Sequence, residues 1–377
     1  MQGSITPGQI RQNNRLQVYH LIYNKKRISQ LEICSELHLS RPTVTGILSQ
    51  LEEKGLIKKN GFISTSQAGR KAAAYSIAET CFISLGAEIR SKELKILAVN
   101  LYGELIDKVQ IPLEYHDQDD YYKEASKAIR EFLAFINVPR ASVLGLGIAM
   151  EAVISEDGRK VLYGKVLDNT GMDVSAIRRH LDIPCALIRT SGSEAVAELW
   201  ASPDLENAFF LSLSEHLGTA LISGHSVVSG KHGRSTSVEH LRMRAGGPPC
   251  YCGRIGCMET LISLNALLQP EETPEEFFMH VRAKEETAVK RWDAYLTGLS
   301  ACIHILHTMF DTDFILGGTL SAYMGKDDLE LLYKKLEQLA LFEEPRDYLH
   351  LSRIPQENAA AGAALPYIWS FLASEDI

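Results

Sequence analysis

Apolar residues at helical spacing mark a short helix near the start of the chain. The positions i, i+3, i+4 and i+7 of one helix face are filled by Val44, Ile47, Leu48 and Leu51. This spacing predicts a helix that buries a single stripe and leaves its other side in solvent. Ser40 is suited to cap its first turn, Pro42 is tolerated there, and Gly55 is suited to end it.

Two further helices are expected before this one, and a pair of short strands after it. Residues 11–23 carry an apolar stripe, and Ser29 with Glu32 forms a capping box at the start of a second helix. Residues 56–65 (LIKKNGFIST) place Asn60-Gly61 between two β-prone runs, which predicts a two-residue hairpin turn. Three helices followed by such a hairpin predict an all-α/winged helix-turn-helix DNA-binding domain, with its linker, over residues 1–75.

From residue 76 to residue 377, the pattern changes to β-rich runs that alternate with amphipathic helices. Runs such as ISLGAEI and SVLGLGIAM are typical of buried strands, and YYKEASKAIREFLAFI carries a helical stripe. Strands that alternate with helices predict an α/β body. No apolar run approaches the ~18 residues that a membrane-spanning helix needs, so we expect no membrane partner.

Electric charge is divided unevenly between the two parts. Residues 1–75 hold eleven Lys and Arg against four Glu, a net charge of +7, which leaves −15 on the rest of a chain whose total is −8. A basic head on an acidic body is typical of a protein whose head alone meets a polyanion, and the partner we predict is a double-stranded DNA operator. A solvated basic face and a protein-docking winged helix stay open as alternatives.

The candidate DNA-contacting residues lie on the third helix, the wing and the connector. The free side of the third helix presents short hydrogen-bonding side chains and one guanidinium that suit the major groove: Arg41, Thr43, Thr45 and Ser49. Lys58 and Lys59 would meet backbone phosphates from the wing. Arg70 lies in a Ser/Gln/Ala-rich connector and is either an arm for the minor groove or part of a solvated linker.

The cysteines and the N-terminal sequence indicate a cytoplasmic protein. Three of the seven cysteines cluster within residues 250–257 and four are scattered singly, which does not resemble a disulfide framework. The N-terminal sequence MQGSITPGQIRQNN contains no apolar signal-peptide core. Both observations favour a reducing compartment.

The clustered cysteines, together with one histidine, form a candidate metal site. His240, Cys250, Cys252 and Cys257 follow the spacing H-x9-C-x-C-x4-C. Three thiols and one imidazole match the ligand set of a closed, structural zinc site, and thiolates favour Zn2+ over magnesium or calcium. The alternative is a group of buried free cysteines beside an unrelated histidine.

These motifs resemble the ROK family of repressors, open reading frames and kinases over nearly the whole chain. The cysteine–histidine cluster is similar to the family's zinc motif, Leu316-Gly317-Gly318 and Ala361-Gly362-Ala363 fit its pattern, and the winged helix is that of its repressor branch. The resemblance implies two actin/hexokinase-like (ribonuclease-H-like) lobes with a sugar site between them. It also implies zinc, homodimers or tetramers and carbohydrate-responsive transcription. We expect lobe 1 over about 80–197 plus the C-terminal helix, and lobe 2 over about 198–360.

Three departures from the kinase members of this family indicate that the chain is not an enzyme. The phosphate motif D-x-G-x-T is replaced by Glu88-Ile89-Arg90-Ser91-Lys92, and a second phosphate loop by Ser214-Glu215-His216-Leu217-Gly218. Bulky and acidic side chains there oppose a nucleotide phosphate. The family's catalytic Asn-Asp pair corresponds to Arg189-Thr190, and a threonine hydroxyl is a poor general base. We therefore assign no catalytic residue.

The candidate ligand-binding residues follow from the same resemblance. They are Arg189, Thr190, Ser237, Glu239, His240 and Glu259. His240 and Glu259 match family sugar contacts, whereas the family's glutamate in E-x-G-H is Ser237 here. These changes indicate either an altered sugar or sugar-derivative effector, which we favour, or no ligand. Arg189 indicates an anionic ligand or a structural salt bridge.

We therefore predict a transcriptional regulator, most simply a repressor, that binds DNA as a homodimer or tetramer. A carbohydrate-type ligand in the interlobe cleft would control it by shifting the population of DNA-competent states. Two alternatives stay open: a sugar kinase with atypical phosphate loops, and a dimeric DNA-binding protein that needs no ligand.

Overall fold

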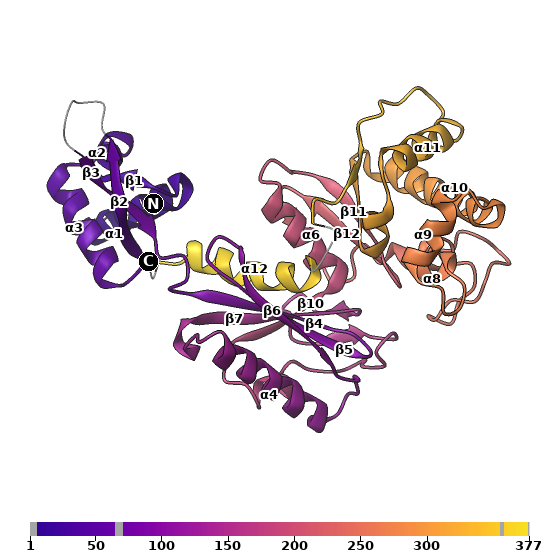
Figure 1. The fold of residues 1–377 in the computed structure, drawn as a ribbon, viewed down its shortest axis with the longest axis horizontal. Helices are drawn as coiled ribbons and strands as arrows, with labels where there is room; N and C mark the ends of the chain where they lie inside the picture. Colours follow the sequence, from indigo (N-terminus) through magenta and orange to yellow (C-terminus); the bar gives the residue numbers. More distant parts are fainter. Residues whose placement is uncertain (1–5, 65–70, 355–357, 376) are drawn as a thin grey trace.

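The computed structural model describes residues 6–64, 71–354, 358–375 and 377. Figure 1 shows three bodies: a small N-terminal head, a first lobe beside it, and a second lobe at the far end from the head. The C-terminal helix lies between the head and the lobes (Figure 1).

The head is a winged helix-turn-helix. Its elements are α1 (Pro7–Lys25), β1 (Ile28–Ser29), α2 (Gln30–Glu36), α3 (Arg41–Glu53), β2 (Ile57–Ser64) and β3 (Lys71–Ile77), with strand order β1-β3-β2. The predicted capping box of α2 is present, and the Ser40 side chain accepts from the backbone N–H of Thr43 at the start of α3. All four residues of the predicted α3 stripe are buried, and Gly55 has φ +70°. Polar capping and apolar spacing therefore define this part correctly.

The wing differs from the sequence prediction, because Asn60-Gly61 is a bulge and not a hairpin turn. Strand β2 continues through both residues: Lys59 pairs with Tyr75 and Phe62 with Ala73, so β2 holds one extra residue. Gly61 has φ +71°, which suits a bulge as well as it suits a turn. The Arg27 guanidinium donates to the carbonyls of Asn60 (3.0 Å) and Phe62 (2.9 Å), which fixes the bulge. The wing is thus built from β2 and β3.

Lobe 1 is a five-stranded mixed sheet of order β10-β7-β4-β5-β6. Its elements are β4 (Ile83–Ile89), β5 (Glu93–Val99), β6 (Leu105–Pro112), α4 (Asp119–Phe135), η1 (Arg140–Ser142), β7 (Val143–Met150), β8 (Val153–Ile154), β9 (Val161–Tyr163), α5 (Ser175–Arg178) and β10 (Cys185–Arg189). The next helix, α6 (Thr190–Ala201), follows β10 and packs against the sheet of lobe 2. Strands β10, β7 and β4 are parallel, so their carboxyl ends meet at one edge. Helix α4 covers one face of the sheet and α12 (Asn358–Leu372) lies on the other (Figure 1).

Lobe 2 is a second five-stranded sheet, of order β13-β12-β11-β14-β15, packed against helices. Its elements are β11 (Ala208–Leu213), β12 (Leu217–Ser223), β13 (Ser226–Val227), η2 (Val238–His240), α7 (Glu259–Ile262), α8 (Leu264–Leu267), α9 (Pro274–Arg282), α10 (Glu286–Phe310), β14 (Asp313–Gly317), η3 (Thr319–Tyr323), α11 (Lys326–Glu337) and β15 (Leu349–Leu351). The two lobes have separate buried cores, as expected for an α/β body of two lobes. None of the helices in the described residues is long and apolar enough to cross a bilayer.

Helix α12 approaches the lobe 1 sheet so closely that only glycine fits beneath it. A Cβ added to Gly86 on β4 would lie 1.8 Å from the carbonyl oxygen of Ala360, and one added to Gly147 on β7 would lie 1.8 Å from that of Ala363. Gly362 of α12 makes the same approach to the Ser193 carbonyl of α6. The helix is therefore seated by direct backbone contact.

The head rests on lobe 1 and on the end of α12 through one shared buried cluster. This cluster includes Val18, Tyr19 and Ile22 of α1, Leu97 and Val99 of β5, and Leu365 and Ile368 of α12. Tyr23 packs on Tyr102, with ring centroids 4.8 Å apart, and its hydroxyl donates to the Leu101 carbonyl at 3.0 Å. The domain boundary expected at residue 75 lies within β3, which ends at Ile77, and the first strand of the body, β4, begins at Ile83.

We expect Gly86→Ala to destabilise the protein. The added methyl must displace the α12 backbone, and overpacking of this kind costs about 1–3 kcal/mol. Urea denaturation of the variant measures the loss.

Gly298→Ala is the matched control, because a Cβ at this position of α10 has its nearest neighbour at 3.6 Å. Alanine there is expected to raise the free energy of unfolding by up to about 1 kcal/mol. Equal effects of the two substitutions would contradict the close seating of α12.

Candidate functional site

The metal cluster lies on a loop between η2 and α7. His240 ends η2, and the three cysteines follow on a segment held by two isolated bridges, Arg242 with Cys257 and Pro249 with Ile255. Gly256, with φ +69°, passes so close to Arg244 that a Cβ would lie 1.8 Å from its carbonyl oxygen. The loop is therefore tight enough to bring distant side chains to one point.

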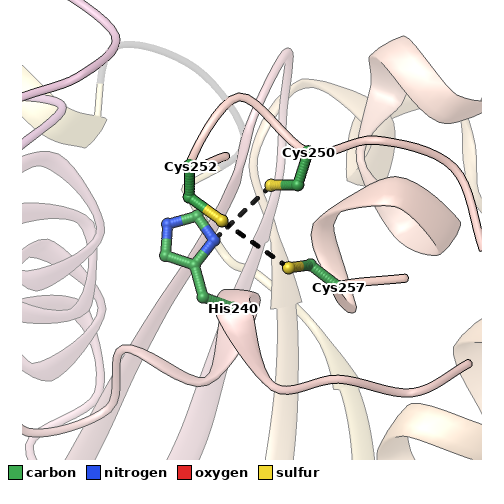
Figure 2. A group of neighbouring side chains, drawn as sticks. All are labelled: His240, Cys250, Cys252 and Cys257. Carbon is green, nitrogen blue, oxygen red and sulfur yellow. Dashed lines mark hydrogen bonds between the residues drawn. The ribbon is translucent and has the colours of Figure 1, made fainter. Parts of the chain in front are cut away.

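The four side chains converge as Figure 2 shows. Their ligand atoms all lie within 4.8 Å of one another, with Cys250 Sγ 3.6 Å from His240 Nδ1 and Cys252 Sγ 3.7 Å from Cys257 Sγ. A tetrahedral ion with bonds of ~2.0–2.3 Å separates its ligand atoms by roughly 3.4–3.8 Å. The cluster, as predicted from its spacing, can hold a metal ion.

The predicted ligand-binding residues gather at the cleft between the lobes. Arg189, Thr190, Glu239 and His240 line one cavity, with Arg189 at the end of β10 and Thr190 at the start of α6. Ser237 does not line the cavity but contacts Arg189, and Glu259 reaches the cleft through His216. The loop of the metal cluster forms one wall, since Tyr251 packs edge-on against both His216 (4.9 Å) and His240 (5.2 Å).

Arg189 is neutralised inside this cleft. Its Nη2 donates to Glu239 Oε1 at 2.7 Å and its Nη1 to Ser237 Oγ at 3.3 Å. Glu239, 4% exposed, also accepts from Thr219 Oγ1 at 3.3 Å. From the sequence, Arg189 indicated either an anionic ligand or a structural salt bridge, and the structure contains the salt bridge. An anionic ligand would have to compete with Glu239 for the guanidinium group.

Glu259 is likewise held by two partners. One carboxylate oxygen lies 3.0 Å from His216 Nδ1 and the other accepts from the Leu217 N–H at 2.7 Å. Burial lowers the pKa of His216, but the hydrogen bond to Glu259 and the neighbouring Glu151 and Glu215 carboxylates raise it overall. His216 was absent from the sequence-based candidates, although it lies in the loop that departs from the kinase pattern.

Three more residues that line the cleft were not among the predicted ligand-binding residues: Arg90, Glu151 and Glu194. Arg90 follows β4 and Glu151 follows β7, so both stand at the carboxyl ends of parallel strands next to Arg189. Ligands of open α/β sheets bind at this edge, and a search of predicted strand ends could have found the first two residues. Glu194 lies one turn into α6, where a helical pattern carries no such signal.

Glu194 is a buried carboxyl with an incomplete set of partners. It is 5% exposed, and its Oε2 makes no hydrogen bond within the described residues. Burial raises its pKa to about 8; a hydrogen bond with Ser212 and the Arg90 charge oppose this rise, whereas the Glu88 and Glu151 charges add to it. Burial therefore favours the neutral form of Glu194 near neutral pH.

The candidate DNA surface is exposed on the head. Arg41, Thr43, Thr45 and Ser49 all face solvent on α3, as the apolar stripe predicts. Thr45 Oγ1 donates to the Arg41 carbonyl at 2.8 Å and accepts from Gln30 Nε2 at 2.6 Å, so α2 braces the start of α3.

The wing lysines are exposed but paired. Lys58 lies 2.8 Å from Glu79, and Lys59 lies 3.3 Å from Glu52. Exposed pairs of this kind contribute at most about 1 kcal/mol, so phosphates can replace the glutamates. Arg70 lies outside the described residues.

A winged helix-turn-helix joined to a two-lobed α/β body with a metal loop beside the cleft defines the class of protein. Residues 11–58 match a sequence model described as winged helix-turn-helix DNA-binding, and residues 84–368 match the model of the ROK family. The chain therefore belongs to the ROK family, as its motifs had indicated.

Curated relatives in this family are transcriptional regulators. The chain is 25% identical to the DNA-binding transcriptional dual regulator NagC of Escherichia coli over 264 residues, which are 69% of this chain but only 64% of NagC. It is 21% identical to the xylose repressor of Bacillus subtilis over 267 residues, 70% of this chain and 69% of that one.

Solved structures confirm the fold over both parts. A ROK family transcriptional regulator, a homologue of the Escherichia coli MLC protein, matches with a TM-score of 0.74 at 24% identity, over 96% of this chain and 98% of that one. A ROK family glucokinase from Streptomyces griseus, in complex with glucose and AMPPNP, matches with a TM-score of 0.65 at 18% identity, over 75% of this chain and 98% of that one.

We expect Glu194→Gln to stabilise the protein at pH 8. The pKa of Glu194 is raised by folding from 4.5 to about 8, so the native state loses stability as the pH rises through this window, by up to about 5 kcal/mol. Glutamine stays neutral, so its advantage should be largest at pH 8 and fall below about 1 kcal/mol at pH 5. Urea denaturation at both pH values measures it.

The exposed Glu206→Gln is the control and should change stability by no more than about 0.5 kcal/mol at either pH. An advantage of Glu194→Gln that does not change with pH would rule out ionisation of Glu194 as its cause.

Proposed function

We propose that this protein is a DNA-binding transcriptional regulator that acts as a repressor in the cytoplasm. The observation that carries the proposal is the free face of α3, where one guanidinium and three hydroxyls stand on the second helix of a helix-turn-helix. The first turn of such a helix contacts base edges in the major groove, and Arg41 lies in this turn. The names of the regulator relatives and the +7 charge of residues 1–75 support it.

The body would hold two or four chains together and sense a ligand. Dimers of helix-turn-helix proteins place two recognition helices about one DNA turn apart, so we propose a homodimer or tetramer on a roughly palindromic operator. Two repressor relatives are named after carbohydrates, N-acetylglucosamine and xylose, which supports a sugar or sugar derivative as the effector. Because the head shares a buried cluster with lobe 1 and α12, a ligand that moves the lobes would also move the head.

We further propose that the metal is zinc and that its role is structural. Three thiols and one imidazole leave no open coordination position for substrate. The ion would hold the loop that carries His240 and Tyr251 against His216 in the cleft wall. Burial lowers the pKa of His240, which favours the neutral imidazole that a metal requires.

The cleft chemistry argues against the sugar-kinase alternative. Thr190 stands where the family's catalytic base is expected, and Glu88 and Glu215 lie in the two loops that family resemblance assigns to the nucleotide phosphates. Bulky and acidic side chains in these loops oppose a polyphosphate, and the hydroxyl of Thr190 is not a base near neutral pH. Binding without turnover is the function that these residues support.

We expect Arg41→Ala to weaken operator binding and relax sequence preference. Loss of a base contact of this type costs about 1–3 kcal/mol. Lys59→Ala should weaken binding to all sequences evenly and lower the salt slope by about 1. Fluorescence anisotropy with a duplex that the protein itself selects from a random library measures both effects.

Lys290→Ala, exposed on α10, is the control and should leave the affinity unchanged. An affinity independent of salt and of Arg41 would contradict DNA binding by the head.

We expect Cys252→Ala to abolish metal binding. Elemental analysis should find one zinc per chain in the natural protein and close to none in the variant. With free zinc at a hundred times its Kd, the lost stabilisation is about 2.7 kcal/mol or more, measurable by thermal melting. Cys34→Ala, in the head, should keep the metal. Another metal in place of zinc, or full zinc in Cys252→Ala, would contradict the assignment.

A further inference from the structure

Two carboxyl groups of the interlobe cleft, Glu151 and Glu194, form no salt bridge within the described residues. Glu151 lines the cavity, and within the described residues it makes no hydrogen bond or salt bridge. Glu194 lines the same cavity, is 5% exposed, and has an unpaired Oε2. A buried acceptor without a donor is costly, so its retention indicates a partner that arrives from outside the chain.

The cationic side chains of the cleft are committed to other carboxylates. Arg90 lies 2.7 Å from Glu88, Arg189 lies 2.7 Å from Glu239, and His216 lies 3.0 Å from Glu259. The other lysine or arginine that lines the cavity, Lys165, is exposed at its rim. Pairing therefore leaves Glu151 and Glu194 as the acidic groups that a ligand can satisfy.

A bare metal ion fits these two carboxyls poorly. Within the described residues, the His240–Cys257 cluster alone brings three or more ligating side chains close enough to share an ion. Two carboxyl groups suit an organic ammonium group, whose three N–H donors they can accept together with one hydroxyl group of the cavity wall.

The remaining cavity wall suits a hydroxylated frame. It offers the hydroxyl groups of Thr190, Ser191, Ser212 and Ser214. Two tyrosines, Tyr163 and Tyr251, add aromatic surface, which commonly covers a sugar ring in carbohydrate sites.

We propose that the cleft binds an amino sugar, whose ammonium group is held by Glu151 and Glu194 and whose hydroxyl groups are held by the serine and threonine side chains. This deepens the proposed function, because it names the effector class of the same cleft, and it rests on that function. It also accounts for the burial of Glu194, an acidic group at a position where a neutral residue would be more stable.

An ammonium group would also change the ionisation of Glu194. The group faces Glu88 and Arg90 from the β4 side, Glu151 from the end of β7 and Ser212 from β11. With a pKa near 8 it is neutral at pH 6.5 before binding, and a cation beside it favours the charged form. Binding is therefore expected to release a proton near neutral pH.

Calorimetric titration of the full-length, zinc-loaded protein at pH 6.5 tests the proposal. The probes are D-glucosamine, D-galactosamine and D-mannosamine, each compared with its N-acetyl derivative, and D-glucose. At least one hexosamine is expected to bind about tenfold more tightly than its N-acetyl form and than D-glucose, as a charge-assisted hydrogen bond predicts. Proton release is measured by repeating the titration in buffers of different ionisation enthalpy.

Glu151→Gln and Glu194→Gln are each expected to lower the hexosamine affinity about tenfold and so to remove most of the preference for a hexosamine over D-glucose. Glu194→Gln should also abolish most of the proton release. The exposed Glu206→Gln is the matched control and should bind as the natural protein does. Thermal melting of each variant confirms that it is folded.

The proposal would be overturned if N-acetylated or neutral sugars bind as tightly as the hexosamines, or if Mg2+ alone binds in a way that depends on Glu151. It would also be overturned if no hexosamine binds at about 10 mM, a concentration at which dissociation constants weaker than about 1 mM are still detected. Operator binding, measured on the same preparation, separates this inference from the proposed function. DNA binding without hexosamine binding overturns the inference alone, whereas loss of both overturns the function as well.

Discussion

The close seating of α12 is the contact on which the arrangement of the three bodies depends. The helix touches β4 and β7 through Gly86 and Gly147, touches α6 through its own Gly362, and ends in the cluster that it shares with the head. Backbone-to-backbone packing allows little sliding, since any side chain at these glycines would collide with a carbonyl group. The head, the lobe 1 sheet and the cleft-lining helix α6 are therefore joined through one rigid element.

The cleft lies where open α/β sheets bind ligands, but its charged side chains do not suit a phosphate. The carboxyl ends of β4, β7 and β10 meet at its floor, which is where open α/β sheets bind ligands. Here these ends carry Arg90, Glu151 and Arg189, and salt bridges neutralise both arginines. Charge pairing of this kind removes the attraction for phosphate while it leaves hydroxyl groups and two carboxyls facing the cavity.

Local patterns were sufficient for much of the fold and for the metal cluster. The α3 stripe, the capping box of α2 and the spacing of His240 and three cysteines act over a few residues, so the sequence alone was enough to predict them. Asn60-Gly61 was the exception: a glycine with positive φ suits a turn and a bulge equally well, and the contact from Arg27 decided between them.

The sequence by itself determined the winged head, the alternation of strands and helices, and the four side chains of the candidate metal cluster. The tertiary structure alone decided which charges meet. Arg189 finds Glu239, Glu259 finds His216, and Glu194 is left with an unpaired oxygen, although these residues lie far apart along the chain or carry no local signal. The physical reason is that helix caps and ligand spacings depend on neighbours in the sequence, whereas burial and ion pairing depend on neighbours in space.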